Sequence, residues 1–397
     1  MKKKKNKKIG RPNALAYWFV YHVLYPHYKR RYGLVLDTAV LREEKGPALI
    51  IAPHTSNKDH WLLGMALYPT RPTFVISEHF TAIPALRPVL RLAHVITKKM
   101  FCPDVGTIMN IMRAAKEGNT IVLFPEGRLT CNGRTGPLTE GTAALTQKLG
   151  LPVYVVTANG ASLTFPKWAP QPRRGSIRIS AQKLMTAEDV KTLPQAEIEA
   201  RMQHAIRHDD AAAMAGVSYH AKDMAAGVDG ILYLCPSCRQ ELTLQAEGDY
   251  ISCPCGLHAR LDERYRLHDA PFHTVLAWYD WQASLVDPFT TVLETDAVIG
   301  AVDAQGNMQE KAGHAHIRMD HETFAFDGVV FGETITFSRK TVGLTAFPTT
   351  VGQHFDIYHN NKLYYIYPQP NTRLAVKWVA YLDRLVEETK EKETVKS

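Results

Sequence analysis

The fold of this chain is decided by two similar stretches, TIVLFPEGR at residues 120–128 and ALIIAPHTSNKD at residues 48–59. Each begins with a short apolar run and continues into turn-forming and polar residues, which predicts a buried strand that ends at a turn. In an open α/β sheet, ligands bind just beyond the carboxyl ends of the strands. The sequence therefore predicts an α/β domain with a site at the ends of these two strands.

The polar residues after the two strands resemble the motifs of a known family. A His-four-residues-Asp motif spans His54 to Asp59, and a Phe-Pro-Glu-Gly motif follows at 124–127. Together they are similar to those of the glycerolipid acyltransferases, the 1-acylglycerol-3-phosphate acyltransferase family, over about residues 10–220. The resemblance implies transfer of an acyl group from a thioester, on coenzyme A or on acyl carrier protein, to a hydroxyl of a lysophospholipid.

His54 and Asp59 are the candidate catalytic residues. An imidazole takes the proton of an attacking hydroxyl well because its pKa lies near neutrality. A carboxylate can hold the ring in one tautomer and balance the imidazolium charge. We expect His54 in the strand-to-helix turn and Asp59 in the first helical turn, because residues five apart on one helix face different directions. The alternative is a structural histidine and a helix-capping aspartate.

The second motif predicts the acceptor site. The resemblance implies that Glu126, Gly127, Arg128 and Thr130 bind the glycerol phosphate of the acceptor. An arginine can fork onto phosphate oxygens, and glycine allows close approach of the backbone. Leu129 stands where the commoner pattern of the family has arginine, and this stretch is more similar to the lysophospholipid acyltransferase branch. Lysophosphatidate and other lysophospholipids therefore both stay open as acceptors, with 1-acylglycerol 3-phosphate favoured.

A further family motif places a basic residue after an apolar strand. Residues 94–99 fit this motif loosely, with lysine in place of arginine. Lys98 and Lys99 are both candidate substrate-binding residues, and the sequence does not decide between them.

Four of the six cysteines form two close pairs with fourteen residues between the pairs. Thiolates in this arrangement give the tetrahedral set that structural zinc prefers: Cys235, Cys238, Cys253 and Cys255. The segment resembles a zinc ribbon with a hairpin of residues 242–244 and 250–252. The second pair is one residue tighter than usual, so His258 stays open as a substitute ligand. No organic cofactor is expected.

The positive charge of the chain is concentrated at its start. The formal net charge is +8, and residues 1–11 carry seven basic and no acidic residues. Such a tail can bind an anionic membrane surface, although a solvated tail and nucleic-acid binding are alternatives. The remainder carries a net charge of only +1. Nucleic acid is an unlikely partner because the hairpin of the predicted zinc ribbon is not basic: Glu241, Glu247 and Asp249 outweigh Arg239.

Residues 14–25 predict a helix that is apolar on nearly all sides and rich in aromatic residues. Together with the basic tail, such a helix is typical of a monotopic membrane anchor. The alternative is packing on the core of the protein itself. No apolar run reaches the roughly 18 residues of a membrane span, and no signal peptide is recognisable. We therefore expect a cytoplasmic protein, peripheral on the inner face of the membrane.

The chain is expected to contain four parts: a basic tail (1–12), the acyltransferase domain (13–225), the zinc ribbon (230–262) and a β-rich domain with a C-terminal helix (270–390). The fold class is α/β, with a mixed sheet flanked by helices. One helix is expected at 195–214, where His204 and His208 suggest either a metal site or, preferably, a solvated face. Asp327-Gly328 is expected to form a turn between two strands, and the end from Glu387 is expected to be disordered.

These observations predict an acyl-thioester-dependent glycerolipid O-acyltransferase. A function of another class is the alternative, namely a non-catalytic protein that binds nucleic acid or protein through the zinc ribbon and carries a relic acyltransferase domain. The intact His54, Asp59 and Glu126 argue against a relic.

Overall fold

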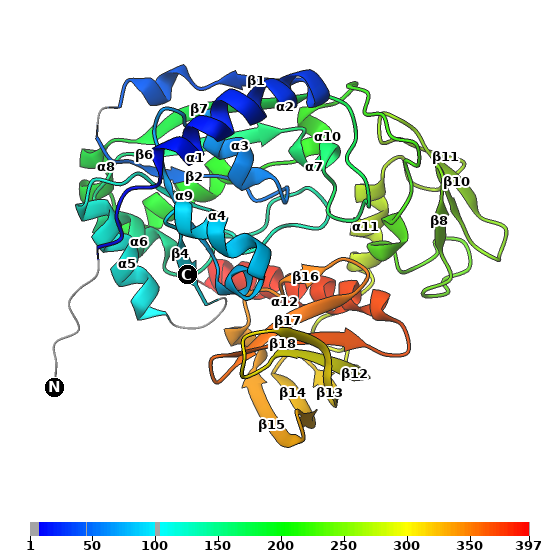
Figure 1. The fold of residues 1–397 in the computed structure, drawn as a ribbon. Coiled ribbons are helices and arrows are strands. Elements are labelled where there is room, and N and C mark those ends of the chain that lie inside the picture. The colour runs from blue at the N-terminus through cyan, green and yellow to red at the C-terminus, as the bar shows by residue number, and fades with distance from the viewer. Residues whose placement is uncertain (1–7, 45, 100–103, 397) are drawn as a thin grey trace. The chain divides into compact units, whose positions relative to one another are not determined.

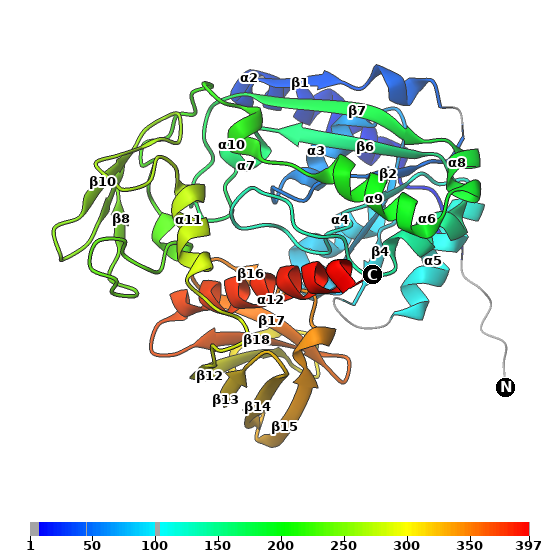
Figure 2. The same ribbon diagram turned by 180° about the vertical axis from the view of Figure 1, so that it is seen from behind.

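The computed structural model describes residues 8–44, 46–99 and 104–396 (Figures 1 and 2). They form two compact units, which are described separately. Unit 1 lies within Met1–Leu129, Gly133–Thr164 and Gly175–Met214, and unit 2 within Thr130–Asn132, Phe165–Arg174 and Ala215–Ser397.

Unit 1 is built on a seven-stranded sheet with the order β1-β7-β6-β2-β5-β3-β4. All neighbouring strands are parallel except β6 and β7. The sheet is therefore mixed, as predicted. Its strands are β1 (Leu34–Asp37), β2 (Leu49–Ile51), β3 (Thr73–Ser77), β4 (Ile96–Lys98), β5 (Ile121–Leu123), β6 (Val153–Asn159) and β7 (Ile177–Met185).

Helices cover both faces of this sheet. Figures 1 and 2 show α1 to α3 on one face and α6 and α9 on the other. Strands β2 and β5 are buried along their whole length, as expected of a sheet covered on both faces. The helices are α1 (Ala14–Phe19), a π-helical segment (Val20–Leu24), α2 (Tyr25–Tyr32), α3 (Asp59–Ala66), α4 (Arg87–Leu92), α5 (Val105–Lys116), α6 (Thr142–Leu149), α7 (Ala161–Thr164), α8 (Ala187–Thr192), α9 (Gln195–Ile206) and α10 (Asp210–Ala213).

The single helix expected at 195–214 is interrupted. Helix α9 ends at Ile206, Arg207 adopts a non-helical conformation, and α10 begins only at Asp210. His204 is exposed, but His208 lies in the connection and is buried. The solvated-face interpretation is therefore wrong for His208, because the break in the helix turns this residue into the protein.

Unit 2 contains two antiparallel sheets, of order β11-β10-β9-β8 and β15-β14-β13-β12-β18-β17-β16. The small sheet has β8 (Gln245–Glu247), β9 (Tyr250–Ser252), β10 (His258–Leu261) and β11 (Leu267–His268). The large sheet has β12 (Leu293–Val302), β13 (Met308–Met319), β14 (Thr323–Val330), β15 (Glu333–Lys340), β16 (Thr349–Thr350), β17 (His354–His359) and β18 (Lys362–Pro368). Helix α11 is Val275–Ser284, and the closing helix α12 is Ala375–Lys396.

The core of the large sheet forms against α12, through Trp378, Tyr381 and Leu382. A β-rich region with a closing helix was predicted, but several details were wrong. Strands β12 and β13 were not expected, the first hairpin strand is Gln245–Glu247 rather than 242–244, and α12 continues to Lys396.

Gly328 lies inside β14, not in a turn. Its strand passes so close to β13 that an added Cβ would stand 2.4 Å from the carbonyl oxygen of His314. Glycine is thus required for strand contact here rather than for chain reversal.

Candidate active site

The site forms where three neighbouring parallel strands end. Strand β2 lies between β6 and β5, and all three point the same way. His54 follows β2, Glu126 follows β5, and Gly160 follows β6. The topology therefore brings together groups that are far apart in sequence, at the edge where open α/β sheets bind ligands.

His54 and Asp59 are in contact, as their proposed pairing requires. His54 Nδ1 and Asp59 Oδ2 are 2.8 Å apart, and the side chains are 16% and 1% exposed. Asp59 is the first residue of α3, and His54 lies in the preceding turn. The same Asp59 oxygen also accepts the backbone N–H of Ser56 at 2.9 Å. With the Nδ1 proton directed at Asp59, the lone pair of the imidazole is on Nε2.

The ionisation of Asp59 depends on its surroundings. Burial raises the pKa of Asp59 well above its usual value, the N–H groups of Ser56 and Thr55 oppose this, and the nearby Asp210 carboxylate raises the pKa further. The charge of His208 lowers it. The pair therefore sits in a buried charge cluster that also includes residues of α10 and the segment before it.

Glu126 links the two motifs. Its Oε1 accepts the backbone N–H of His54 at 2.8 Å, and its Oε2 accepts that of Gly136 at 2.9 Å. Burial raises the pKa of Glu126 to about 7, although both N–H groups and the charge of Arg128 oppose the shift. Because both oxygens bind backbone, the contacts of Glu126 position the turn that carries His54.

Two aromatic side chains form the wall beside His54, and the sequence did not single them out. The Phe124 ring stacks on His54 with centroids 4.2 Å apart. His60 meets the edge of both rings, and burial lowers its pKa to about 3. His60 is thus a neutral aromatic neighbour and not a second base. Phe124 could have been found from its place in the FPEG motif.

The predicted phosphate contacts divide between the two units. Arg128 is half-buried in unit 1, whereas Thr130 belongs to unit 2, where its hydroxyl donates to Asn132 Oδ1 at 2.7 Å. Lys98 ends β4, and within residues 8–44, 46–99 and 104–396 its Nζ makes no ion pair. Burial lowers the pKa of Lys98 although the charge of Asp104 opposes this. The backbone N–H of Lys99 donates to Asp104 at 3.1 Å.

The four predicted cysteines come together in unit 2. Their sulfur atoms all lie within 4.8 Å of one another, and Cys235–Cys255 and Cys238–Cys253 are 3.7 and 3.8 Å apart. A tetrahedral zinc with Zn–S bonds of about 2.3 Å requires sulfur–sulfur distances of about 3.8 Å, so the set fits this ion. His258 lies outside the cluster and contacts Ser252 Oγ at 2.9 Å. Cys102 falls outside the described residues, and Cys131 is buried.

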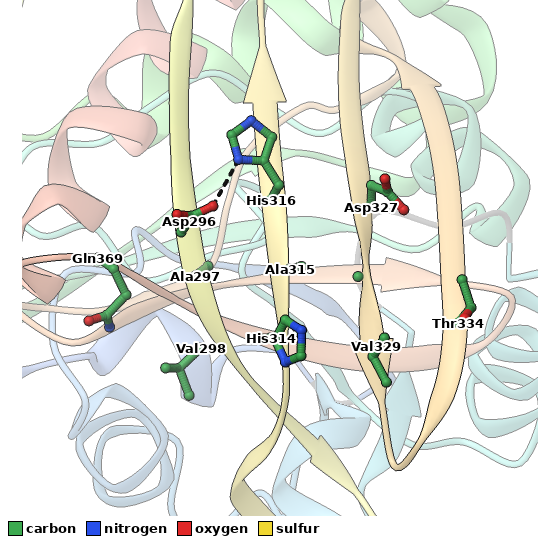
Figure 3. Close-up of a pocket in the computed structure, with 11 residues that line it drawn as sticks. Asp296, Ala297, Val298, His314, Ala315, His316, Asp327, Val329, Thr334 and Gln369 are labelled. Atoms are coloured by element: carbon green, nitrogen blue, oxygen red, sulfur yellow. Dashed lines mark hydrogen bonds and ion pairs between the residues drawn. The ribbon is translucent and has the colours of Figure 1, made fainter.

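An open hollow of about 540 Å³ lies on the outer face of the large sheet of unit 2 (Figure 3). It is lined by alternate side chains of β12 to β15, including His314, His316 and Asp327. His316 contacts Asp296 at 2.9 Å and Glu294 at 2.8 Å. Asp327 accepts the hydroxyl of Thr336 at 2.7 Å.

Part of this chain is similar to known acyltransferases. Residues 35–159 match the family model described as Acyltransferase. Over 145 residues, 36% of this chain, the sequence is 26% identical to the 1-acyl-sn-glycerol-3-phosphate acyltransferase BAT2, chloroplastic, of Brassica napus. The match covers 41% of that protein, so the chain spans well under half of its length.

A solved structure is similar to part of this chain. It is the 1-acyl-sn-glycerophosphate (LPA) acyltransferase PlsC from Thermotoga maritima, with 15% sequence identity and a TM-score of 0.42. The likeness covers 48% of this chain and 76% of that chain.

Proposed function

We propose that this protein transfers an acyl group from a thioester, on coenzyme A or on acyl carrier protein, to a hydroxyl of a lysophospholipid, with 1-acylglycerol 3-phosphate as the favoured acceptor. The observation that carries this proposal is the contact between His54 and Asp59 at the end of β2. It supplies a base of suitable tautomer at the edge of the sheet where ligands bind.

In the proposed reaction, His54 Nε2 removes the proton of the acceptor hydroxyl as its oxygen attacks the thioester carbonyl carbon. Asp59 stabilises the imidazolium that forms. The tetrahedral intermediate then collapses, the carbon–sulfur bond breaks, and the departing thiolate receives the proton from His54. No acyl-enzyme is formed, because the acceptor oxygen is itself the nucleophile.

Lys98 and Arg128 are the cations proposed to hold the acceptor phosphate. A cation that burial makes costly is stabilised when an anion binds beside it. Lys98 fits this description better than Lys99, because its pKa is lowered by burial and it has no ion-pair partner among the described residues. Arg128 can contact two phosphate oxygens at once. Glu126, in contrast, is proposed to act by placing the turn.

Unit 1 also presents an apolar surface suited to a lipid interface. Tyr17 is buried and donates to the carbonyl of Pro72 at 2.7 Å, so one side of the N-terminal helix packs on the protein. The other side leaves large apolar residues exposed: Leu15, Trp18, Phe19 and Val23. In the part of the chain that the structure describes, no helix is long and apolar enough to cross a bilayer. We propose that this side contacts the membrane surface peripherally.

This membrane contact can be tested by sedimentation with vesicles that contain an anionic phospholipid. Trp18→Ser should reduce binding several-fold, because a large interfacial side chain is lost. Phe331→Ser, which removes an equally exposed aromatic residue from unit 2, is the control and should bind like the wild type. Equal binding by all three proteins would contradict the assignment of this surface.

The four-cysteine cluster is proposed to hold a structural zinc ion through Cys235, Cys238, Cys253 and Cys255. Bound zinc would crosslink the two turns that carry the cysteine pairs. Elemental analysis of the purified protein should give about one zinc per chain, and Cys253→Ser should lower both the zinc content and the melting temperature of unit 2. Full zinc content in this variant would contradict the four-thiolate set.

The substrate is tested by offering acyl-CoA and acyl-carrier-protein thioesters to the wild-type protein with a panel of lysophospholipids. The proposal expects acylated product, greatest with an acceptor whose phosphate is a terminal monoester. If product forms only with an acceptor that has another head group, the proposed acceptor is wrong. If no combination of thioester and lysophospholipid gives product, the proposed function is refuted.

A further inference from the structure

A second imidazole–carboxylate pair lies buried in unit 1. His208 Nε2 and Asp210 Oδ1 are 2.8 Å apart, and the two side chains are 6% and 1% exposed. Neither residue belongs to the His54–Asp59 pair or to the proposed phosphate contacts. Buried ionised groups are costly unless they are paired, and here the two groups pair with each other.

Asp210 fixes the end of β6, the strand next to the one that carries His54. Its Oδ1 accepts the backbone N–H of Gly160 at 2.6 Å. Its Oδ2 accepts the backbone N–H and the hydroxyl of Ser162 at 2.7 and 2.6 Å. Four donors, including His208, therefore converge on this carboxylate, which ties the turn after β6 to the segment between α9 and α10.

His208 connects the same segment to the loop after the FPEG motif. The backbone N–H of Thr135 donates to the His208 carbonyl at 3.1 Å, and the His208 N–H donates to Thr135 Oγ1 at 2.9 Å. The next residue, Gly136, donates to Glu126, which in turn accepts the N–H of His54. The His208 backbone is thus linked to the His54 backbone by these hydrogen bonds and by the peptide bond between Thr135 and Gly136.

The two pairs are also coupled by charge. Burial alone would lower the pKa of His208, but the hydrogen bond and charge of Asp210, with the charges of Asp209 and Asp59, raise it. Among the described residues, these carboxylates are the charged groups with the largest effects on the pKa of His208. The loop side contributes the neutral Thr135, while Arg134 is exposed and pairs with Asp209 through its backbone. The segment between α9 and α10 thus contributes one cation, His208, whose charge acts on Asp59.

We propose that His208 and Asp210 are positioning residues of the acyl-transfer site. Together they hold the loop after the FPEG motif and the end of β6, so that Glu126 keeps the backbone of His54 in place. The His208 imidazolium also balances the Asp59 carboxylate. This proposal rests on the acyl-transfer function proposed above.

His208→Gln tests this role, because glutamine keeps an N–H donor for Asp210 and removes the charge. The matched control is His204→Gln, which changes an exposed histidine of α9. We expect kcat to fall about tenfold with KM within about twofold, and the rise of kcat/KM with pH to move to higher pH, because loss of a nearby cation favours the protonated dyad. A kcat and a pH profile equal to those of His204→Gln would overturn the proposal.

A second measurement does not require activity. In protein with labelled histidine, the titration midpoint of the His54 ring, assigned with His54→Ala, should move to higher pH in His208→Gln and stay fixed in His204→Gln. A moved midpoint with an inactive wild type would mean that the coupling exists but the proposed function is wrong. An unmoved midpoint would overturn the coupling whatever the activity.

Ser162→Ala provides a second test of the proposal in case the His208→Gln protein does not fold. It removes one of the four donors to Asp210 and leaves both charges in place. A fall of about threefold in kcat with the wild-type melting temperature is expected. Wild-type kcat in Ser162→Ala, together with an unfolded His208→Gln, would show that the pair serves stability alone and would overturn the proposal.

Discussion

Two of the histidine–carboxylate contacts in this protein have the same length and very different surroundings. His54 Nδ1 lies 2.8 Å from Asp59, and His316 Nε2 lies 2.8 Å from Glu294. The side chains of His54 and Asp59 are 16% and 1% exposed where three parallel strands end, whereas those of His316 and Glu294 are 50% and 53% exposed. Figure 3 shows His316 on the outer face of an antiparallel sheet.

The two histidines also differ in what their second nitrogen does. His316 contacts a further carboxylate, Asp296, through Nδ1 at 2.9 Å. The hydrogen bonds and charges of Asp296 and Glu294 raise the pKa of His316. An exposed ion pair is moreover screened by water and salt. Contact length alone therefore does not distinguish these two pairs, whereas burial and strand topology do.

Of the substitutions considered, Asp59→Asn should cause the largest fall in kcat, because it removes the carboxylate that contacts His54. Without the carboxylate, the ring loses its fixed tautomer and the counter-charge of the imidazolium, and kcat should fall by roughly 10³–10⁴. The measurement is the rate of product formation at saturating acceptor. A fall of less than tenfold would mean that Asp59 is only a helix-start residue.

Glu126→Gln should have the next largest effect. The amide can accept only one of the two backbone N–H groups, and a buried N–H left unpaired costs about 1–3 kcal/mol. We expect kcat to fall about 10- to 100-fold while the KM for acceptor stays within a few-fold. A large rise in KM with unchanged kcat would instead indicate direct contact with the acceptor.

Lys98→Met should change binding rather than turnover. Loss of one charged contact should raise the KM for a phosphate-bearing acceptor about tenfold and leave kcat nearly unchanged. Because the pKa of Lys98 is lowered by burial, removing its charge should not reduce the free energy of unfolding. Lys99→Met is the matched control, and an equal rise in its KM would reassign the phosphate contact.

His316→Gln should have the smallest effect. An exposed pair contributes little to stability, so the free energy of unfolding should change by less than about 1 kcal/mol and kcat by less than twofold. A tenfold loss of activity would contradict the distinction between the two pairs, because it would show that the outer face of the large sheet contributes to the reaction.

The sequence predicted the centre of the site better than its support. His54, Asp59 and Glu126 follow short apolar runs, and such runs predict buried strands. His208 and Asp210 carry no comparable signal, because the pattern around them continues that of α9 and the break after Ile206 depends on tertiary contacts. Strands β12 and β13 do alternate, but the charged residues of their outer face lower their apparent β propensity.

The most direct test of the central claim is the rate of acyl transfer by wild-type protein and by His54→Ala, with the same thioester and acceptor. Melting temperature and zinc content should first be shown to be equal. If His54 is the base, the variant should lose at least 10²–10⁴-fold in kcat. Equal rates for the two proteins would contradict the assignment of the base and, with it, the account of the site.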